Sequence, residues 1–249
     1  MAESCELTTP SERSEGGTKI PSLPAYGTSD HYLGDKGQEY WKWQSGGGLF
    51  GARINSHKFR HRIRPSDTVI DFGCGGGFLL SVLDCRRKIG VEINPFAREH
   101  AISLGIECYS KVSEVPDAIA DLIVSDYALE HVPYPIGVLA ELREKLKPEG
   151  MLALCVPIDN WRHQKKFDCR DPNHHLHTWT PQLLGNTLSD AGYKVLEIHA
   201  RVFCWPDSWT VAAYGRLPYW IFRQICFWYG FATGRGWEIL ALARRKSSQ

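Results

Sequence analysis

A glycine-rich segment that follows a short apolar run carries the clearest chemical signal in the sequence. It reads Val69-Ile-Asp-Phe-Gly-Cys-Gly-Gly-Gly77, and glycine permits positive φ angles and the close approach of a ligand to the backbone. The free N–H groups at the start of the helix expected next suit a carboxylate or a phosphate. Glu92 ends the following apolar run, and its carboxylate can accept hydrogen bonds from both hydroxyls of a ribose. These features predict a site for a nucleoside-containing ligand.

A histidine-rich segment, residues 168–180, holds the second group of useful side chains. Histidine suits general-base chemistry because its ordinary pKa lies near neutral pH. His175 and His177 alternate with Leu176, so in an extended stretch their rings would share one face. We expect His175, together with His177 and His131, to act on a second ligand as base or hydrogen-bond partner. The alternative is that these histidines cap the next helix or bind backbone carbonyls.

The same segment also offers potential zinc ligands. They are Cys169, His174, His175 and His177. Their spacing matches no standard zinc pattern, and the sequence therefore predicts no metal site.

Alternating strands and helices must position these residues. Apolar runs typical of buried parallel strands alternate with helical patterns from residue 67 onward. Cap signals at Asn94-Pro95 and Thr180-Pro181 predict the starts of two helices. The expected strands cover residues 68–72, 88–92, 106–109, 121–125, 151–156, 193–200 and 237–243. The pattern predicts an α/β fold, a doubly wound, mostly parallel seven-stranded sheet with helices on both faces. Ligands of such sheets bind at the carboxyl ends of the strands, where the segments named above would meet.

The glycine spacing separates two classes of nucleoside-binding protein. The dinucleotide pattern G-x-G-x-x-G fails, because the sixth position counted from Gly73 is Phe78. A nicotinamide-dependent oxidoreductase is therefore disfavoured. The observed spacing, D-x-G-x-G-x-G from Asp71 to Gly77, resembles the first motif of class I S-adenosylmethionine-dependent methyltransferases.

Two further segments extend this resemblance. Residues 121–133, which include Glu130-His131, look like the fourth-strand motif of these methyltransferases. Residues 142–150 resemble their R-x-L-K-P-G-G segment, with Glu149 in place of the first glycine. The three motifs are similar in order and spacing to the ubiquinone- and menaquinone-biosynthesis-type branch, which acts on small molecules. The resemblance implies a Rossmann-like sheet whose last strand is antiparallel.

The resemblance also implies S-adenosylmethionine as the cofactor and a set of residues that bind it. Glu92 would hold the ribose hydroxyls, Ile93 would cover the adenine and Asp126 would face the methionine end. Tyr40 would close over the cofactor or, alternatively, belong to a hydrophobic clamp on the core. The implied cofactor-binding residues are Asp71, Gly73, Gly75, Gly77, Glu92, Ile93, Asp126 and Tyr40.

Composition suggests three regions along the chain. Residues 1–28 are rich in Ser, Glu, Thr, Gly and Pro and are expected to be disordered. Residues 29–66 are expected to form a helical, aromatic cap, and residues 67–249 the methyltransferase domain with an aromatic insertion at 201–235. The aromatic density of residues 205–231 suits an interfacial helix, and hence a peripheral membrane contact, or an apolar substrate wall. A helix hairpin packed on the sheet edge explains it equally well.

Charge and cysteine content narrow the partners and the compartment. The net charge of +1 provides no overall attraction to nucleic acid, and the basic stretch from Lys58 to Arg64 is the only support for an RNA partner. A solvated helix face explains that stretch at least as well. The eight cysteines form no CxxC pair, and the first residues do not resemble a secretory signal. No window of about 18 residues is apolar enough for a transmembrane helix. We therefore expect a cytoplasmic protein, with the inner membrane face as an alternative location.

These observations converge on methyl transfer from S-adenosylmethionine to a small-molecule acceptor. The expected acceptor atom is an oxygen of a sugar, a glycan or a lipid-linked precursor. The alternatives are an RNA or protein acceptor, and a non-catalytic interaction module with the same fold.

Overall fold

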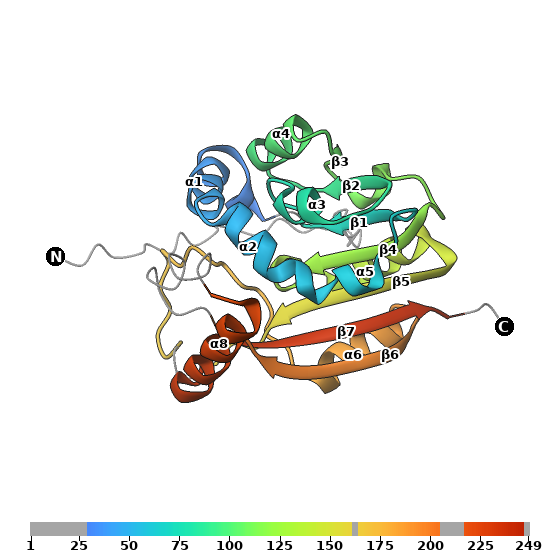
Figure 1. Cartoon of the computed structure of the whole chain (residues 1–249). Coiled ribbons are helices and arrows are strands. Elements are labelled where there is room, and N and C mark those ends of the chain that lie inside the picture. Colours follow the sequence, from blue (N-terminus) through green and yellow to red (C-terminus); the bar gives the residue numbers. More distant parts are fainter. Residues whose placement is uncertain (1–28, 161–163, 205–216, 247–249) are drawn as a thin grey trace, which may run out of the picture.

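A seven-stranded sheet forms the centre of the structure, a computed structural model that describes residues 29–160, 164–204 and 217–246 (Figure 1). The strand order is β3-β2-β1-β4-β5-β7-β6. Neighbouring strands are parallel from β3 to β5, whereas β7 runs antiparallel to both β5 and β6. The strands are β1 Thr68–Phe72, β2 Arg87–Val91, β3 Glu107–Tyr109, β4 Ala120–Asp126, β5 Leu146–Pro157, β6 Tyr193–Val202 and β7 Trp237–Arg245. The predicted fold class and the antiparallel last strand are confirmed.

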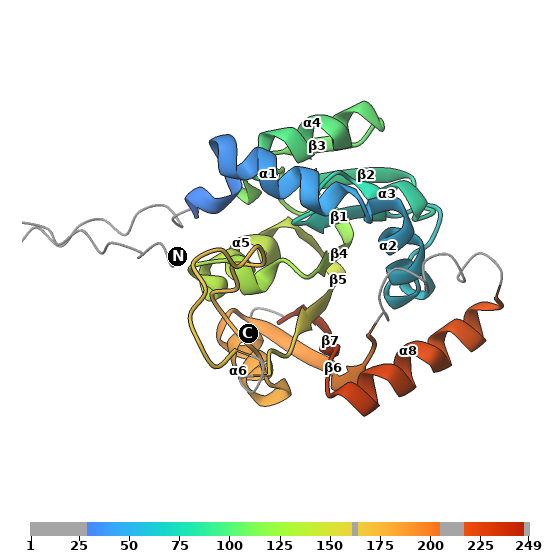
Figure 2. The same ribbon diagram turned by 90° about the vertical axis from the view of Figure 1, so that its left-hand side faces the viewer.

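Helices cover both faces of the sheet, with α5 and α6 on one side and α2 and α3 on the other (Figure 2). The alternation of side chains along each strand explains the two cores, because neighbouring residues point to opposite faces. Ile70 packs with Leu139 and Leu184 on one face, and Val69 packs with Leu80 on the other. The helices are α1 Gly34–Ser45, α2 Gly48–Asn55, α3 Phe78–Val82, α4 Pro95–Ser103, α5 Pro135–Lys145, α6 Pro181–Asp190 and α8 Tyr219–Thr233.

The two predicted helix caps form as expected. The Asn94 side chain accepts hydrogen bonds from the backbone N–H groups of Phe96 and Ala97, at 3.0 and 3.4 Å. The Thr180 hydroxyl accepts one from the N–H of Leu183 at 3.1 Å. A proline follows each cap, where its missing N–H costs nothing. Local sequence thus fixes where α4 and α6 begin.

One strand begins earlier than the sequence predicts. β5 starts at Leu146 instead of residue 151, and Leu146 pairs with Ala120 across an irregularity in the register. Gly150 lets the two strands come close, since a Cβ there would lie 2.7 Å from the carbonyl oxygen of Ala120. The Pro-Glu-Gly sequence at residues 148–150 therefore lies within the strand.

The aromatic insertion is described in part, because residues 205–216, like the predicted tail 1–28, lie outside the described residues. Its helix, α8, packs Phe222 and Cys226 against Ile54 and Phe203. The opposite side of α8 exposes Trp220, Trp228 and Phe231. In the part of the chain that the structure describes, no helix combines the length and apolarity needed to span a bilayer.

Candidate functional site

A cavity of about 470 Å³ lies at the carboxyl ends of β1, β2, β3 and β4. Its volume falls within the range of small-molecule and cofactor pockets, about 300–1,000 Å³. The lining residues are Phe72, Gly73, Val91, Glu92 and Ile93 from the ends of β1 and β2, Ser110 to Ser113 after β3, Tyr127, Ala128 and His131 to Pro133 after β4, Val138 and Glu141 from α5, and Ser29, Tyr32, Tyr40 and Gln44 before and within α1.

The glycine loop after β1 adopts a backbone that favours glycine at three positions. Gly73, Gly75 and Gly77 have φ angles of 73°, 51° and 76°. The N–H of Gly73 donates to the carbonyl of Val91 at 2.9 Å, which ties the loop to β2. A Cβ on Gly73 would lie 2.3 Å from the Cβ of Ala128, the next wall of the cavity. Gly73 therefore packs closely against Ala128, and any other residue at this position would clash with that side chain.

Glu92 is held by the loop that it faces. One carboxylate oxygen accepts a hydrogen bond from the N–H of Gly75 at 2.8 Å, and the other accepts from the N–H of Asn94 at 2.7 Å. Burial raises the pKa of Glu92, while these two N–H groups lower it. Each oxygen keeps lone pairs for donors from the cavity. The fixed carboxylate is thus suited to grip the two hydroxyls of a ribose.

The N-terminal segment supplies one wall of the cavity. Tyr40 lines it and packs edge-on against Tyr32, with ring centroids 4.9 Å apart. The side-chain amide of Asn94 donates to the carbonyl of Gly37 at 2.8 Å and so fastens α1 to the start of α4. Trp41 instead stacks on Phe78, and it is not among the residues that line the cavity.

Four of the residues expected to bind the cofactor support the cavity without lining it. Asp71 is buried in β1, and burial raises its pKa well above the usual range. The backbone N–H of Gly75 donates a hydrogen bond to Glu92. Gly77 precedes α3 and packs against Ile106. Asp126 accepts a hydrogen bond from Lys58 Nζ at 2.7 Å. Gly73, Glu92, Ile93 and Tyr40 do line the cavity.

Lys58 is the clearest departure from the sequence analysis. Its side chain is 1% exposed and forms ion pairs with Asp126 at 2.7 Å and with Glu238 at 3.0 Å. Arg201 also pairs with Glu238, at 2.6 Å. Burial opposes the charge of Glu238, but Lys58 and Arg201 lower its pKa to about 2. Lys58 is therefore a buried structural cation and not part of a solvated basic face. The sequence did contain one sign of this ion pair: Glu238 is a single acidic residue in the apolar run of β7, and a buried carboxylate needs a cationic partner.

His131 lines the cavity on the side of α5 and the loop after β4. Its Nδ1 lies 2.7 Å from the Tyr32 hydroxyl and 3.4 Å from the carbonyl of His174. Burial and the neighbouring His175 lower the pKa of His131 to about 4. The ring is consequently neutral at pH 7 and offers one unprotonated nitrogen.

The other two predicted histidines lie just behind the cavity wall and are not among its lining residues. His175 Nδ1 lies 2.9 Å from a carboxylate oxygen of Asp159, and its ring meets that of His131 at 5.0 Å. Burial lowers the pKa of His175, but the hydrogen bond and charge of Asp159 outweigh burial and raise it. His177 Nε2 lies 2.9 Å from the carbonyl of Val132. His177 thus makes the backbone contact that the alternative interpretation expected.

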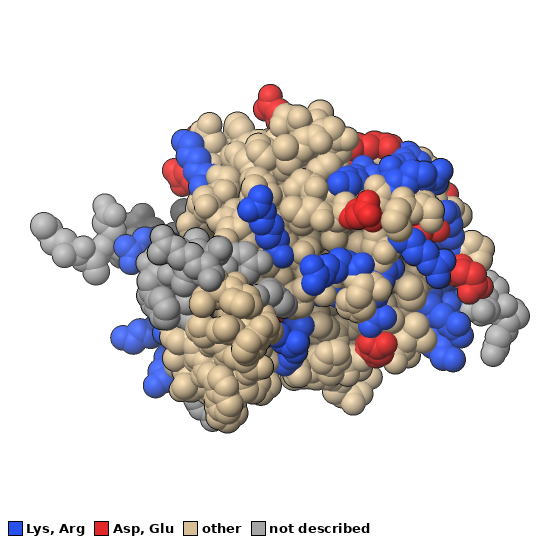
Figure 3. Space-filling view, in the orientation of Figure 1, with Lys and Arg blue, Asp and Glu red and all other residues tan. Residues whose placement is uncertain are grey.

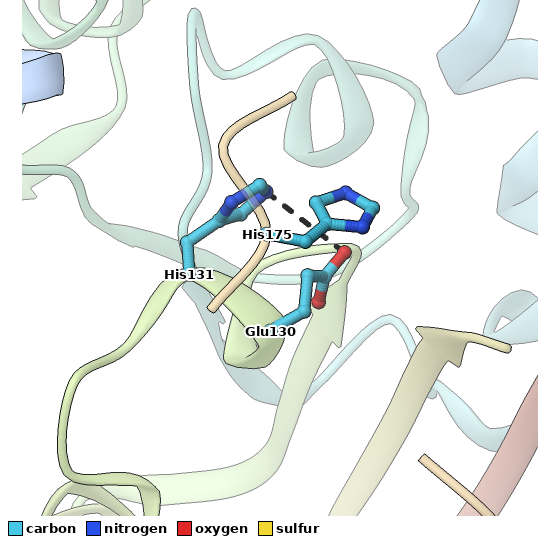
Figure 4. A group of neighbouring side chains, drawn as sticks. All are labelled: Glu130, His131 and His175. Atoms are coloured by element: carbon cyan, nitrogen blue, oxygen red, sulfur yellow. Dashed lines mark ion pairs between the residues drawn. The ribbon is translucent and has the colours of Figure 1, made fainter. Parts of the chain in front are cut away.

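Glu130 was not singled out by sequence, although it stands in the fourth-strand motif. Its side chain is fully buried beneath His131 and His175 (Figure 4). Burial raises its pKa to about 8. Only the fold reveals this, because no local pattern distinguishes a buried glutamate in the short 3-10 turn Leu129–His131 that follows β4.

Solved structures with a similar fold include an S-adenosylmethionine-dependent methyltransferase from Thermotoga maritima. It is 18% identical, with a TM-score of 0.58, and the match covers 84% of this chain and 95% of that one. Another, from Archaeoglobus fulgidus, is 16% identical with a TM-score of 0.58, covering 85% and 100%. These likenesses show the fold.

A family model matches residues 50–198. This match and the similar solved structures together identify the chain as a class I methyltransferase whose methyl donor is S-adenosylmethionine. The chain belongs to the family described as the methyltransferase domain. The expected class, cofactor and enzymatic character are confirmed.

Curated relatives carry the name ubiquinone biosynthesis O-methyltransferase. The one from Nitrosococcus oceani is 34% identical over 105 residues, which are 36% of this chain and 43% of that protein. The one from Aeromonas salmonicida is 32% identical over 123 residues, covering 44% and 45%. The chain thus spans less than half the length of these relatives.

Proposed function

We propose that this chain methylates a hydroxyl oxygen of a small acceptor. The observation that carries this proposal is a single cavity with two different ends. Glu92, fixed by Gly75 and Asn94, faces one part of it, and His131 with Tyr32 faces another. The first suits a nucleoside, and the second suits a polar acceptor. The relatives named as O-methyltransferases support oxygen as the atom that is methylated.

The side chains divide the work of positioning and proton transfer. Bound S-adenosylmethionine supplies an electrophilic methyl group on its sulfonium sulfur. Glu92 binds the ribose, Tyr40 covers the cavity, and Tyr32 and His131 orient the acceptor hydroxyl. His175, which Asp159 makes the stronger base, takes the proton of that hydroxyl. Holding the two reactants in line converts a bimolecular reaction into an intramolecular one.

Replacing His175 with glutamine is expected to lower kcat by about 100-fold or more, the usual contribution of a general base. Binding of S-adenosylhomocysteine should stay unchanged, because His175 is not among the residues that line the cavity. The measurement is transfer of labelled methyl groups to a panel of hydroxylated sugars, glycans and lipid-linked precursors, with mass spectrometry of the product. His199→Gln, an exposed histidine of β6, is the matched control. Full activity of His175→Gln would remove the assigned role.

We propose further that the acceptor is lipid-linked and that α8 rests on an anionic bilayer surface. Exposed fractions of 68%, 60% and 61% for Trp220, Trp228 and Phe231 are unusual for an aqueous surface. Arg223 and Arg235 flank these rings, and no acidic residue occurs between residues 208 and 237. The face of α8 seen in Figure 3 is largely uncharged, with basic side chains near its edge. Aromatic rings beside arginine suit a membrane interface.

Vesicle sedimentation tests this contact. The double substitution Trp228→Ser and Phe231→Ser is expected to reduce binding to anionic vesicles by about tenfold or more, since each buried aromatic contributes about 1.5–3 kcal/mol. Trp43→Ser removes a tryptophan that is 55% exposed on α1 and should have no effect. Equal binding of both variants would place the contact elsewhere. Equal binding to neutral vesicles would remove the role of the arginines.

The alternative of an RNA acceptor loses part of its support. It rested on the basic stretch from Lys58 to Arg64, but Lys58 is buried and Arg62 pairs with Glu197 at 2.6 Å. A small acceptor therefore remains the proposal.

A further inference from the structure

The carboxylate of Glu130 has an unusual environment for a buried polar group. The side chain is 0% exposed, and among the described residues neither of its oxygens has a hydrogen-bond partner. Buried polar groups are almost always hydrogen-bonded, because an unpaired one loses its interaction with water and gains nothing in return. A ligand that Glu130 itself would bind accounts for this arrangement.

Two imidazoles lie over that carboxylate. One possible ligand atom from each of Glu130, His131 and His175 lies within 4.8 Å of the other two (Figure 4). His131 Nε2 lies 3.9 Å from Glu130 Oε1. Two nitrogens and one carboxylate form the donor set of His₂Glu zinc sites and of the two-histidine, one-carboxylate iron sites.

In each of the two imidazoles, Nδ1 has a hydrogen-bond partner, as it usually does in histidines that bind a metal through Nε2. His175 Nδ1 lies 2.9 Å from Asp159, and His131 Nδ1 lies 2.7 Å from the Tyr32 hydroxyl. When each Nδ1 carries the proton and donates it in this bond, each Nε2 is left with a free lone pair. Metal-ligating histidines nearly always have such a partner, which fixes the tautomer and the ring orientation.

We propose that Glu130, His131 and His175 bind a divalent first-row transition cation such as Zn²⁺, Fe²⁺ or Co²⁺. The two imidazole ligands favour these cations over Mg²⁺, which prefers oxygen ligands. Bonds of about 2.0–2.2 Å require the ligand atoms to draw closer together than they are in this structure. The sequence pointed away from a metal because the histidine segment alone lacks the spacing, whereas the fold supplies two ligands from the loop after β4.

The cation would act on the acceptor, and this part rests on the proposed function. Three protein ligands leave coordination positions open, and His131 lines the cavity. With its Nε2 on the cation, His175 would be a ligand and not the base described above, so a hydroxyl of the acceptor that binds there becomes more acidic and releases its proton to solvent. Its oxygen then forms the new bond to the methyl carbon, while the carbon–sulfur bond breaks and its electron pair stays on sulfur. Two neighbouring acceptor oxygens, as in a vicinal diol, would fill two open positions.

Titration of the purified full chain with Co²⁺, without cofactor or acceptor, tests the site. We expect the chain to bind one Co²⁺. Calorimetry and the visible absorption of the ion measure this binding. Glu130→Gln and His175→Gln should each weaken binding by at least tenfold. Asp159→Asn should weaken it by about 10- to 100-fold, as loss of a partner of a ligand usually does. Cys169→Ser, which removes the cysteine of the histidine-rich segment, and His199→Gln should leave it unchanged.

Two results would overturn the inference. One is no binding of Co²⁺ by the folded parent protein, and the other is unchanged binding in both Glu130→Gln and His175→Gln. His175 lies in an irregular segment, so its variant remains informative if loss of Glu130 impairs folding. Titration of the same samples with S-adenosylhomocysteine separates the two proposals. A folded sample that binds S-adenosylhomocysteine but does not bind Co²⁺ would overturn the metal site alone. A sample that binds Co²⁺ but does not bind S-adenosylhomocysteine would overturn the proposed function alone.

Discussion

Replacing Glu92 with alanine is expected to weaken binding of S-adenosylhomocysteine by about 100-fold. The carboxylate is the charged acceptor at the end of β2, and hydrogen bonds to charged groups contribute about 1.5–3 kcal/mol each. Loss of two such bonds to the ribose amounts to about 3 kcal/mol, or roughly 100-fold in affinity. The substitution also frees the N–H groups of Gly75 and Asn94, which Glu92 now holds. Isothermal titration calorimetry measures the effect directly.

The control for this experiment is another glutamate of the same region. Glu99→Ala changes an exposed residue of α4 and should leave the affinity within twofold of the parent chain. An affinity of Glu92→Ala equal to that of the control would show that the ribose does not bind at the end of β2. The assignment of the glycine loop would then have to be abandoned as well, because Glu92 fixes its geometry.

Replacing Lys58 with methionine is expected to lower the free energy of unfolding by about 3–5 kcal/mol, the usual cost of removing one partner from a buried ion pair. The methionine would fill similar space but leave Asp126 and Glu238 without their cation. Urea unfolding followed by circular dichroism provides the measurement. Arg60→Met, an exposed neighbour, should change stability by less than about 0.5 kcal/mol. A loss below about 1 kcal/mol for Lys58→Met would contradict the structural role.

The pH dependence of stability gives this prediction a second signature. The pKa of Glu238 is about 2 in the folded chain, below its ordinary value of 4.5. A lowered pKa means that the folded state binds the proton less readily than the unfolded state does. The stabilisation is therefore complete above about pH 4.5 and is lost as the pH falls towards 2. Lys58→Met should lose less stability than the parent chain over that interval.

Local patterns predicted the scaffold of the site well. The apolar runs of β1, β2 and β4 and the caps at Asn94 and Thr180 depend on neighbouring residues, and the structure has them where they were expected. The position of Glu92 at the end of β2 follows from the same logic. The start of β5 was missed because it depends on the approach of Ala120, a contact with another strand.

Long-range charge pairing was beyond what these patterns contain. Lys58 reads as one member of a basic stretch, and only the fold brings it to Asp126 and Glu238. Glu130 and His175 are likewise far apart in sequence and meet because the segment after β5 folds back over the loop after β4, where the N–H of Leu176 donates to the carbonyl of Glu130. Burial, and not residue type, gives these groups their chemistry.

The contact between α1 and α4 has a practical consequence for how a minimal protein should be cut. The family model begins at residue 50, yet Tyr32, Tyr40 and Gln44 enclose the ligand cavity from before that point. A fragment trimmed to residues 50–198 would also lack β7, the central antiparallel strand between β5 and β6. Expression designs should therefore retain at least residues 29–246. A shorter fragment would leave the ligand cavity open on the side of α1 and would lack β7, the strand that connects β5 to β6 in the sheet.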